Sequence, residues 1–307
     1  MKPKILITAG DPLGIGPEVA VQAAASPAVR RACLPCIAGD TAALIKAGWT
    51  PALCPLLPVD AAGRDSRRPR PTAAGGEASL KAVLLGIKLV KQGGFAALVT
   101  APISKESWAM ARAPQPAHTD LFRALEHTEP LMLFTRGRVN AALATEHLPI
   151  KDLHRALTKE LVIQKALLFA AALKAVGLTR PRLTICALNP HAGDGGVIGR
   201  EEIDTLIPAV KALRGRGLRI SGPAPADAAW AAHLAGKSDG LLALYHDQAL
   251  VPLKTAPGAG PAVHWTWGLP FIRTSPAHGT AFDIAGRGKA DPSGMKEAVL
   301  FAVKLIK

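Results

Sequence analysis

The stretch "KILITAGDPLGIGPEVAVQAAAS", residues 4–26, contains the opening unit of an α/β fold. An apolar strand runs into a glycine-rich turn, and Pro17 with Glu18 begins a helix directly behind it. The turn lacks the G-x-G-x-x-G spacing of a dinucleotide-binding loop, and Glu18 would repel a phosphate at the start of the helix. The turn therefore has two interpretations, a tight structural turn or an anion-binding loop made of backbone N–H groups.

Apolar strands alternate with amphipathic helices along the rest of the chain. This rhythm predicts mostly parallel sheet covered by helices on both faces, with one antiparallel pairing between two adjacent strands at 131–136 and 139–147. A length of 307 residues fits two domains or one large α/β unit. Further strands are expected at 36–40, 95–102, 182–189 and 240–247, and helices at 77–94, 104–113, 117–127, 158–177, 201–217, 226–237 and 295–307.

The charge balance favours anionic partners, because 37 Lys and Arg face 23 Asp and Glu, a net charge of +14. The densest basic cluster, "GRDSRRPRP" at 63–71, lacks aromatic residues that could stack on bases, so we interpret it as a solvated loop rather than a nucleic-acid site. The sequence shows neither a signal peptide nor a membrane span, which favours a cytoplasmic protein.

Four cysteines are present, and Cys33 with Cys36 forms a lone C-x-x-C. A structural zinc site needs more ligands at regular spacing, so we expect reduced, mostly buried thiols.

Three histidines follow the ends of apolar strands: His147, His191 and His246. Ligands of open α/β sheets bind beyond the carboxyl ends of strands, and three neutral imidazoles suit zinc or another late first-row divalent ion. The alternative is that these are loop histidines satisfied by backbone groups.

Two other segments carry polar groups that could bind a ligand. "NPHAGDGG" at 189–196 has glycines that let a ligand approach the backbone closely. The segment 269–291 is expected to be a polar loop after an apolar pentad, and its Arg273 could form a cationic pair with Lys254.

Seven motifs resemble, in order, those of the 4-hydroxythreonine-4-phosphate dehydrogenase (PdxA) family of vitamin B6 synthesis. Each motif alone is weak, but the series covers nearly the whole chain at fitting distances. The motifs are "GDPLGIGPE", "VTAPISK", "HTDLF", "ALATEHLPIKDL", "LNPHAGDGG", "YHDQALVPLK" and "GLPFIRTSPAHGTAFDIAG".

The resemblance implies two α/β/α domains with mostly parallel sheets, similar to isocitrate and isopropylmalate dehydrogenases, with the active site in the interdomain cleft. We expect a first domain at 1–115 plus 275–307 and a second at 116–274. The second would carry the metal ligands and the contacts of a homodimer with a shared active site. NAD or NADP would bind without a Rossmann fingerprint, and we expect Asn189, Gly193 and Asp194 to contact it.

The resemblance also implies a divalent metal (Zn, Mg or Co) on His147, His191 and His246, with one ligand from the partner subunit. The substrate would be a small phosphorylated amino acid. The positions that match the family's substrate-binding residues are His118, Thr119, Lys254, His264 and Arg273. His264 is a departure, because this chain has "VHWTWGLP" where the family has asparagine in "VNxTLGLP".

The implied reaction is oxidation at C3 of 4-phosphohydroxy-L-threonine with loss of CO2, giving 3-amino-2-oxopropyl phosphate for pyridoxal 5'-phosphate synthesis. Asp247 and Lys105 are the candidates for the base.

Two alternatives stay open. One is a decarboxylating cis-dihydrodiol dehydrogenase of an aromatic dicarboxylate of the terephthalate diol type, since His264 between Trp265 and Trp267 would suit a flat ring. The other is a non-catalytic relative that binds a metal or a phosphometabolite. Neither alternative involves nucleic acid or a membrane.

Overall fold

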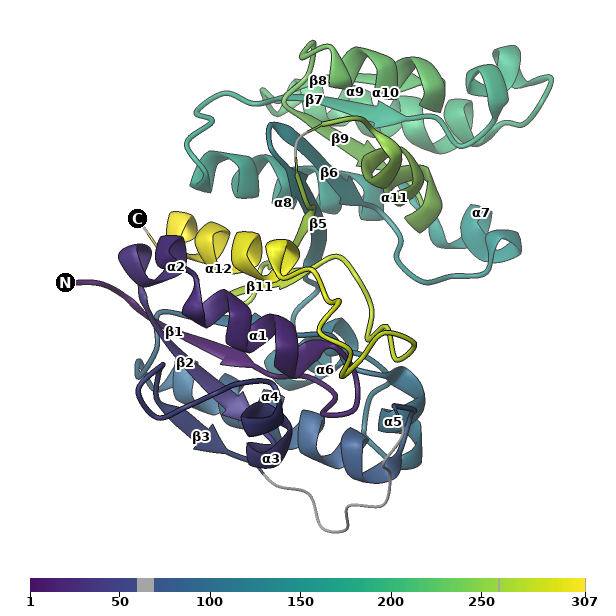
Figure 1. The fold of residues 1–307 in the computed structure, drawn as a ribbon. Coiled ribbons are helices and arrows are strands. Elements are labelled where there is room, and N and C mark those ends of the chain that lie inside the picture. The colour runs from purple at the N-terminus through teal and green to yellow at the C-terminus, as the bar shows by residue number, and fades with distance from the viewer. Residues whose placement is uncertain (60–68, 259, 307) are drawn as a thin grey trace. The chain divides into compact units, whose positions relative to one another are not determined.

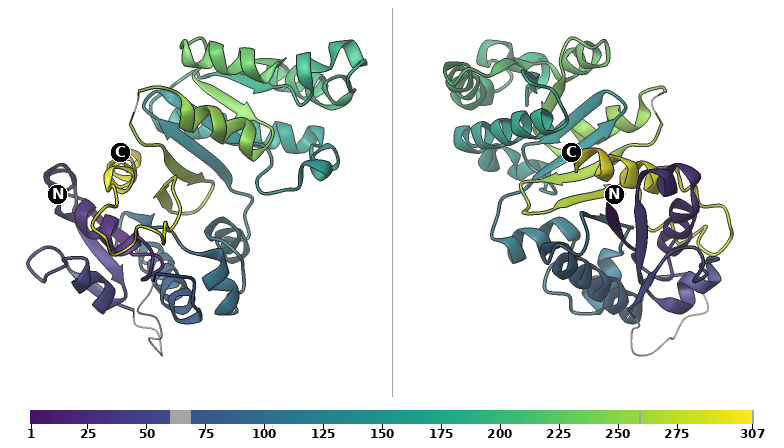
Figure 2. Two further views of the ribbon diagram at one scale, coloured as in Figure 1. Left: turned by 45° about the vertical axis from the view of Figure 1, so that its right-hand side comes forward. Right: turned by 90° about the vertical axis from the view of Figure 1, so that its left-hand side faces the viewer.

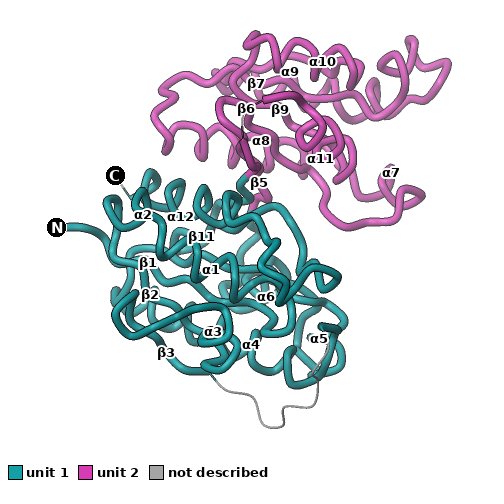
Figure 3. The backbone as a smooth tube through the Cα atoms, in the orientation of Figure 1, with its two compact units in different colours: residues 1–130, 263–307 teal, residues 131–262 magenta. Residues whose placement is uncertain are grey.

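A computed structural model describes residues 1–59, 69–258 and 260–306. The chain forms two compact units, one made of 1–130 with 263–307 and the other of 131–262 (Figure 3). Each unit is an α/β structure, as expected. The first unit extends beyond the predicted boundaries at 115 and 275, because helix α6 (His118–Glu126) and the strands that follow residue 262 pack within its core.

The sheet of the first unit has the strand order β3-β2-β1-β4-β11-β10. All neighbouring strands in it pair in parallel except β10 and β11, which form an antiparallel hairpin. The bounds are β1 Lys4–Thr8, β2 Leu34–Gly39, β3 Leu56–Pro58, β4 Ala97–Thr100, β10 Val263–Trp267 and β11 Ile272–Pro276 (Figure 1).

Two hydrophobic cores cover the two faces of this sheet, and β1 shows how its residues divide between them. Ile5 and Ile7 belong to one core and Leu6 to the other, because successive side chains of a strand point to opposite faces. The first core includes residues of α1 (Gly16–Ala25), α2 (Pro27–Ala32), α3 (Thr41–Lys46) and α12 (Ser293–Leu305). The second includes residues of α4 (Ala73–Lys91), α5 (Lys105–Met110) and α6.

The second unit has the strand order β5-β6-β9-β7-β8. The β5–β6 pair is antiparallel, which confirms the prediction for these strands, and the other pairs are parallel (Figure 2). The strands are β5 Leu131–Arg136, β6 Val139–Leu143, β7 Arg182–Cys186, β8 Arg219–Ala224 and β9 Gly240–Ala243. The helices are α7 Leu153–Ala156, α8 Lys159–Ala175, α9 Ile207–Gly215, α10 Ala226–Leu234 and α11 His246–Thr255, with short helical segments at Ile150–Asp152, Pro190–Gly196 and Glu202–Leu206.

The structure differs from the sequence prediction in the segment 263–276. The expected polar loop at 269–291 begins with strand β11, which pairs with β4 and β10. Its polar residues 273–275 are therefore buried in a sheet rather than exposed in a loop.

Other expectations can be compared directly. All four cysteines are free and buried, as predicted. Most of the basic cluster at 63–71 lies outside the described residues. Within the described part of the chain, helices long and apolar enough to cross a membrane do not occur.

Candidate functional site

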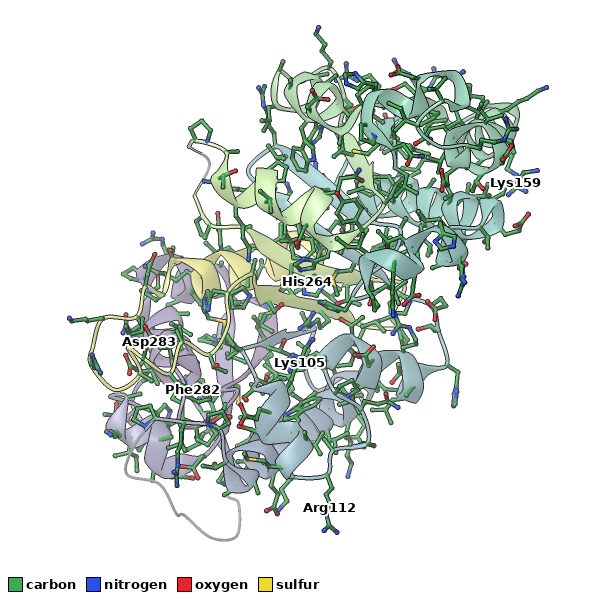
Figure 4. All side chains as sticks on the ribbon, turned by 90° about the vertical axis from the view of Figure 1, so that its right-hand side faces the viewer. Lys105, Arg112, Lys159, His264, Phe282 and Asp283 are labelled. Atoms are coloured by element: carbon green, nitrogen blue, oxygen red, sulfur yellow. The ribbon has the colours of Figure 1, made fainter. Side chains whose placement is uncertain are left out.

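The β10–β11 hairpin places four polar side chains on one face of the first unit's sheet. His264 is directly opposite Ser275 in the register, and Thr266 is opposite Arg273. Because side chains alternate along a strand, the intervening Trp265 and Thr274 belong to the other face. Figure 4 marks His264 on this hairpin.

Arg273 is the centre of this polar group, although only 3% of it is exposed. One terminal nitrogen donates to Nδ1 of His264 and to Oγ1 of Thr266, both at 3.0 Å, and the other donates to Oγ1 of Thr100 at 2.7 Å. Its Nε is buried without a hydrogen-bond partner. The guanidinium carbon also lies 5.3 Å from the ring centroid of Phe122, a cation–π contact.

Among the described residues Arg273 has no carboxylate partner. Burial lowers the pKa of its guanidinium to about 9, since a charge removed from water without a counter-charge is costly. Neutral hydroxyl and ring acceptors satisfy part of the group but leave its charge uncompensated. An anion that contacted this guanidinium would remove much of that cost.

Helix α6 adds a second polar group beside the arginine. Its first residue, His118, stacks on Phe122 at 6.0 Å and meets the edge of Trp108 at 5.4 Å. Burial, and then the positive charge of Arg273, holds the pKa of His118 well below its usual value, so the ring is neutral. Its Nε2 is buried without a partner, and Thr119 is buried next to it in the sequence.

A different cluster forms in the second unit around two of the three predicted metal ligands. The rings of His147 and His246 have centroids 5.3 Å apart. Nδ1 of His246 donates to a carboxylate oxygen of Asp247 at 2.6 Å, so in the neutral ring the lone pair would be on Nε2. A carboxylate in this position is the usual partner of a metal-binding histidine.

His191 does not join this pair within one chain. In the part of the chain that the structure describes, three or more His, Cys, Asp or Glu side chains do not gather closely enough to hold a metal. His191 is exposed and lies in the segment Pro190–Gly196, where six successive residues, 191–196, have positive φ. Two of the three predicted ligands are thus adjacent, and the third is presented on a protruding loop.

The predicted cofactor residues lie in the same loop. Glu202, only 1% exposed, accepts hydrogen bonds from the backbone N–H groups of Leu188 and Asn189, both at 2.8 Å, and from the Asn189 side chain. The Asn189 amide also donates to Glu201 and lowers the pKa of that carboxyl. A Cβ at Gly193 would lie 2.8 Å from Glu202 Oε2, so a glycine is needed there. Asp194 is exposed.

Lys254 and Lys105 are both exposed, in different units. Lys254 lies in the last turn of α11, and Lys105 is the first residue of α5 (Figure 4). The end of α11 is held by Arg136, which donates to the carbonyl oxygens of Leu253 and Ala256 at 2.7 and 2.6 Å. Arg136 had no signal in the sequence, because these acceptors are backbone atoms far along the chain.

The glycine-rich turn of the first unit has the geometry of a tight structural turn. A Cβ at Gly16 would lie 2.1 Å from the carbonyl oxygen of Ala9, and Glu18 accepts a hydrogen bond from the backbone of Gly286. Asp11, which is fully buried, accepts from Ser107 Oγ at 2.7 Å and from the Leu13 N–H at 3.0 Å. Burial raises the pKa of Asp11.

Sequence reasoning missed the hydroxyl partners of Arg273, Thr100 and Thr266. Thr100 ends β4, and only the pairing of β11 with β4 brings it to the arginine. The alternation of apolar and polar residues in "VHWTW" was a usable signal for a strand at Thr266.

The fold is that of an α/β protein of two units, with a buried arginine in one unit and a pair of adjacent histidines in the other. A sequence model of the family described as "Pyridoxal phosphate biosynthetic protein PdxA" matches residues 23–302. Because the match spans most of the chain, this protein belongs to the PdxA family.

Relatives of known name agree with this assignment. The chain is 35% identical to 4-hydroxythreonine-4-phosphate dehydrogenase of Geobacter metallireducens, over 99% of this chain and 96% of that protein. It is 42% identical to the Caulobacter vibrioides enzyme of the same name, over 77% and 73% of the two chains. These relatives are oxidoreductases.

Solved structures show the same fold. The crystal structure of 4-hydroxythreonine-4-phosphate dehydrogenase from Klebsiella pneumoniae matches with a TM-score of 0.86 at 31% identity, covering 100% of this chain and 98% of that one. A terephthalate 1,2-cis-dihydrodiol dehydrogenase from Burkholderia xenovorans matches with a TM-score of 0.68 at 26% identity, over 99% and 98% of the chains.

Proposed function

We propose that this chain is a metal-dependent NAD(P) dehydrogenase that oxidises and decarboxylates 4-phosphohydroxy-L-threonine to 3-amino-2-oxopropyl phosphate, in the synthesis of pyridoxal 5'-phosphate. The observation that carries the proposal is the buried guanidinium of Arg273, which lacks a carboxylate partner among the described residues. Such a group is a receptor for an anion, and the relatives named above are dehydrogenases of a phosphorylated amino acid.

The phosphate would be bound by Arg273 with His118, Thr119, His264 and Lys254. Charge-assisted hydrogen bonds from a guanidinium to phosphate are about twice as strong as neutral ones, so Arg273 would supply most of the affinity. His118 fits a supporting role because it is neutral and its buried Nε2 lacks a partner. Lys254 would add a point charge from its exposed position on α11.

The donor set in the second unit fits a divalent metal. His147 and His246 are adjacent, and Asp247 holds the proton on Nδ1 of His246 so that Nε2 can bind an ion. His191 would complete the site from the partner subunit of a homodimer, since it does not meet the pair within its own chain. A divalent ion held there would acidify the substrate hydroxyl and polarise the carbonyl formed by oxidation.

The base that takes the hydroxyl proton is one of two residues, Asp247 or Lys105. Asp247 already accepts from His246, an arrangement that fits a residue orienting a metal ligand. Lys105 is exposed at the start of α5. Its side chain would have to be neutral to accept a proton.

NAD or NADP would accept the hydride released from C3. The candidate contacts are Asn189, Gly193 and Asp194, on the loop that Glu202 holds in place. The Asn189 amide is already bonded to Glu201 and Glu202, so only its oxygen could contact the cofactor.

The alternative substrate, an aromatic dihydrodiol dicarboxylate, has structural precedent in the Burkholderia xenovorans enzyme. The reason drawn from the sequence, His264 between two tryptophans, is wrong for Trp265. Its ring lies on the face opposite His264 and packs edge-on against Phe301 of α12 at 5.2 Å. A flat ring near His264 would therefore not stack on Trp265.

Turnover with the two substrates tests the proposal. We expect NAD(P) reduction with 4-phosphohydroxy-L-threonine, and little with the unphosphorylated amino acid or the terephthalate dihydrodiol. Activity should be lost on chelation and return with a divalent ion. Preferential turnover of the dihydrodiol would overturn the proposal, and absence of turnover with a metal-loaded dimer would favour a non-catalytic relative.

A further inference from the structure

The contact between Arg273 and His264 fixes the protonation of the histidine ring. An arginine has only donors, so Nδ1 of His264 must accept the hydrogen bond of 3.0 Å. Ser275 Oγ lies 3.3 Å from the same nitrogen. The ring is therefore neutral, and its proton is on Nε2.

A proton added to Nδ1 would break this arrangement. The ring would then carry a positive charge and point an N–H at the terminal nitrogen of Arg273, which has no lone pair to accept it. Two cations would be in contact in a region where His264 is 9% and Arg273 3% exposed. In the empty site the positive charge of Arg273 thus keeps His264 neutral.

A bound anion would favour the protonated state of His264 instead of the neutral one. A phosphate dianion beside Arg273 would attract the terminal nitrogen that now donates to His264, and would stabilise a positive charge on the ring. Ser275 on β11 offers a hydroxyl to the ring. Arg273 is itself held by the hydroxyls of Thr266 on β10 and Thr100 on β4, and its charge helps to lower the pKa of His118 on α6.

We infer that His264 is a proton-linked positioning residue, which holds Arg273 while neutral in the empty site and takes up a proton when a phosphate dianion binds. The inference rests on the proposed function, because it concerns the same anion site. The proton comes from solvent and ends on Nδ1, while the hydrogen bond from Arg273 passes from the ring to a phosphate oxygen. An asparagine at this position could hold Arg273 through its amide oxygen but could not take up the proton.

Calorimetry measures the proton directly. The binding of 4-phosphohydroxy-L-threonine without NAD(P) is followed at pH 8 in buffers of different ionisation enthalpy, where the phosphate is already a dianion. We expect the wild type to take up about one proton more than His264→Asn, so that its dissociation constant rises about tenfold more per pH unit than that of the variant. Equal proton uptake by the two proteins would overturn the inference.

Two controls separate the inference from the proposed function. Inorganic phosphate is titrated in parallel: if the amino acid does not bind but phosphate binds with proton uptake in the wild type only, the substrate is wrong and the role of His264 stands. If neither ligand binds, both fail. Nitrogen-15 spectra of the empty protein, with His264→Asn identifying the resonance, should show an unprotonated Nδ1, and a protonated one contradicts the inference. His264→Gln replaces the asparagine variant if that protein does not fold.

Discussion

Arg273 is the residue on which the proposed substrate depends most. Arg273→Lys keeps a positive charge but loses the planar fork that donates to His264, Thr266 and Thr100. The KM for the phosphorylated substrate should rise tenfold or more, which corresponds to about 1.4 kcal/mol of lost binding. Steady-state kinetics check this, with the exposed Arg216→Lys as a matched control. An unchanged KM would mean that the phosphate binds elsewhere.

Asp247 has two possible roles, and one substitution distinguishes them. Asp247→Asn removes the carboxylate that orients His246, so the affinity for zinc, measured by calorimetry, should fall about 10- to 100-fold. Glu297→Gln, at an exposed position on α12, is the control and should bind zinc normally. If zinc binding is intact while kcat collapses, Asp247 is the base instead.

Sequence patterns predicted which site residues lie close together only where the ends of neighbouring strands meet. His147 and His246 follow the neighbouring strands β6 and β9, and their proximity was predictable from that rule. His191 follows β7, yet a left-handed loop carries it away from the pair, and sequence does not fix such a backbone. The tautomer of His264 depends on a contact with the opposite strand and had no signal at all.

At the scale of elements, the approach of α4 to α5 depends on a missing side chain. A Cβ at Gly76 would lie 2.0 Å from the carbonyl oxygen of Ser107, whereas one at Gly215 in α9 would meet nothing within 4 Å. Gly76→Ala should therefore lower the free energy of unfolding by about 1–3 kcal/mol. Gly215→Ala should raise it by about 0.4–1 kcal/mol, because alanine restricts the unfolded chain. Urea denaturation measures both, and equal effects would contradict the close approach.

The loop between β1 and α1 contains a pH-dependent contribution to stability. Burial raises the pKa of Asp11 above its value in the unfolded chain, so the folded state binds this proton more tightly. This contribution grows as the pH falls toward the unfolded value near 3.8 and is lost as the pH rises through the raised pKa. Asp11→Asn does not titrate; its amide oxygen can still accept from the Leu13 N–H, while its amide nitrogen would donate to Ser107 Oγ instead of accepting from it.

The Tm of the wild type should therefore fall relative to the Tm of Asp11→Asn as the pH rises from 4 to 7. Thermal unfolding of both proteins across this pH range gives the difference between their Tm values. The other carboxyl groups are the same in both proteins, so their pH effects cancel in this difference. A difference that does not change with pH would show that Asp11 is not buried as a titrating group.

The periodicity of apolar residues predicted most helices and strands, because each of these elements buries one apolar face or run. The strand β4 and the helix α8 have continuous apolar runs or clear caps, and both were expected near their observed places. The strand β11 was missed because it buries Arg273, Thr274 and Ser275, residues typical of a loop. What stabilises it is pairing with β4, a contact between segments more than 170 positions apart in the chain.

For the whole molecule, subunit mixing tests the proposed shared site. If His191 comes from the partner, inactive His191→Ala and inactive His147→Ala subunits should complement each other. A statistical mixture then regains about a quarter of the wild-type sites, since half of the dimers are mixed and one of their two sites is complete. His147→Ala mixed with His246→Ala should regain nothing, because one chain supplies both residues. Recovery in the second mixture after verified exchange would overturn this assignment.

The first unit is made of two separate segments of the chain, so the order of synthesis affects when this unit can fold. Residues 131–262 are continuous, so all five strands of this unit, β5 to β9, are synthesised before residues 263–307. The first unit must wait for its last 45 residues, 263–307, which supply β10, β11 and the α12 side chains of one core. Until then β4 lacks its β11 neighbour, an open sheet edge of the kind on which chaperones act.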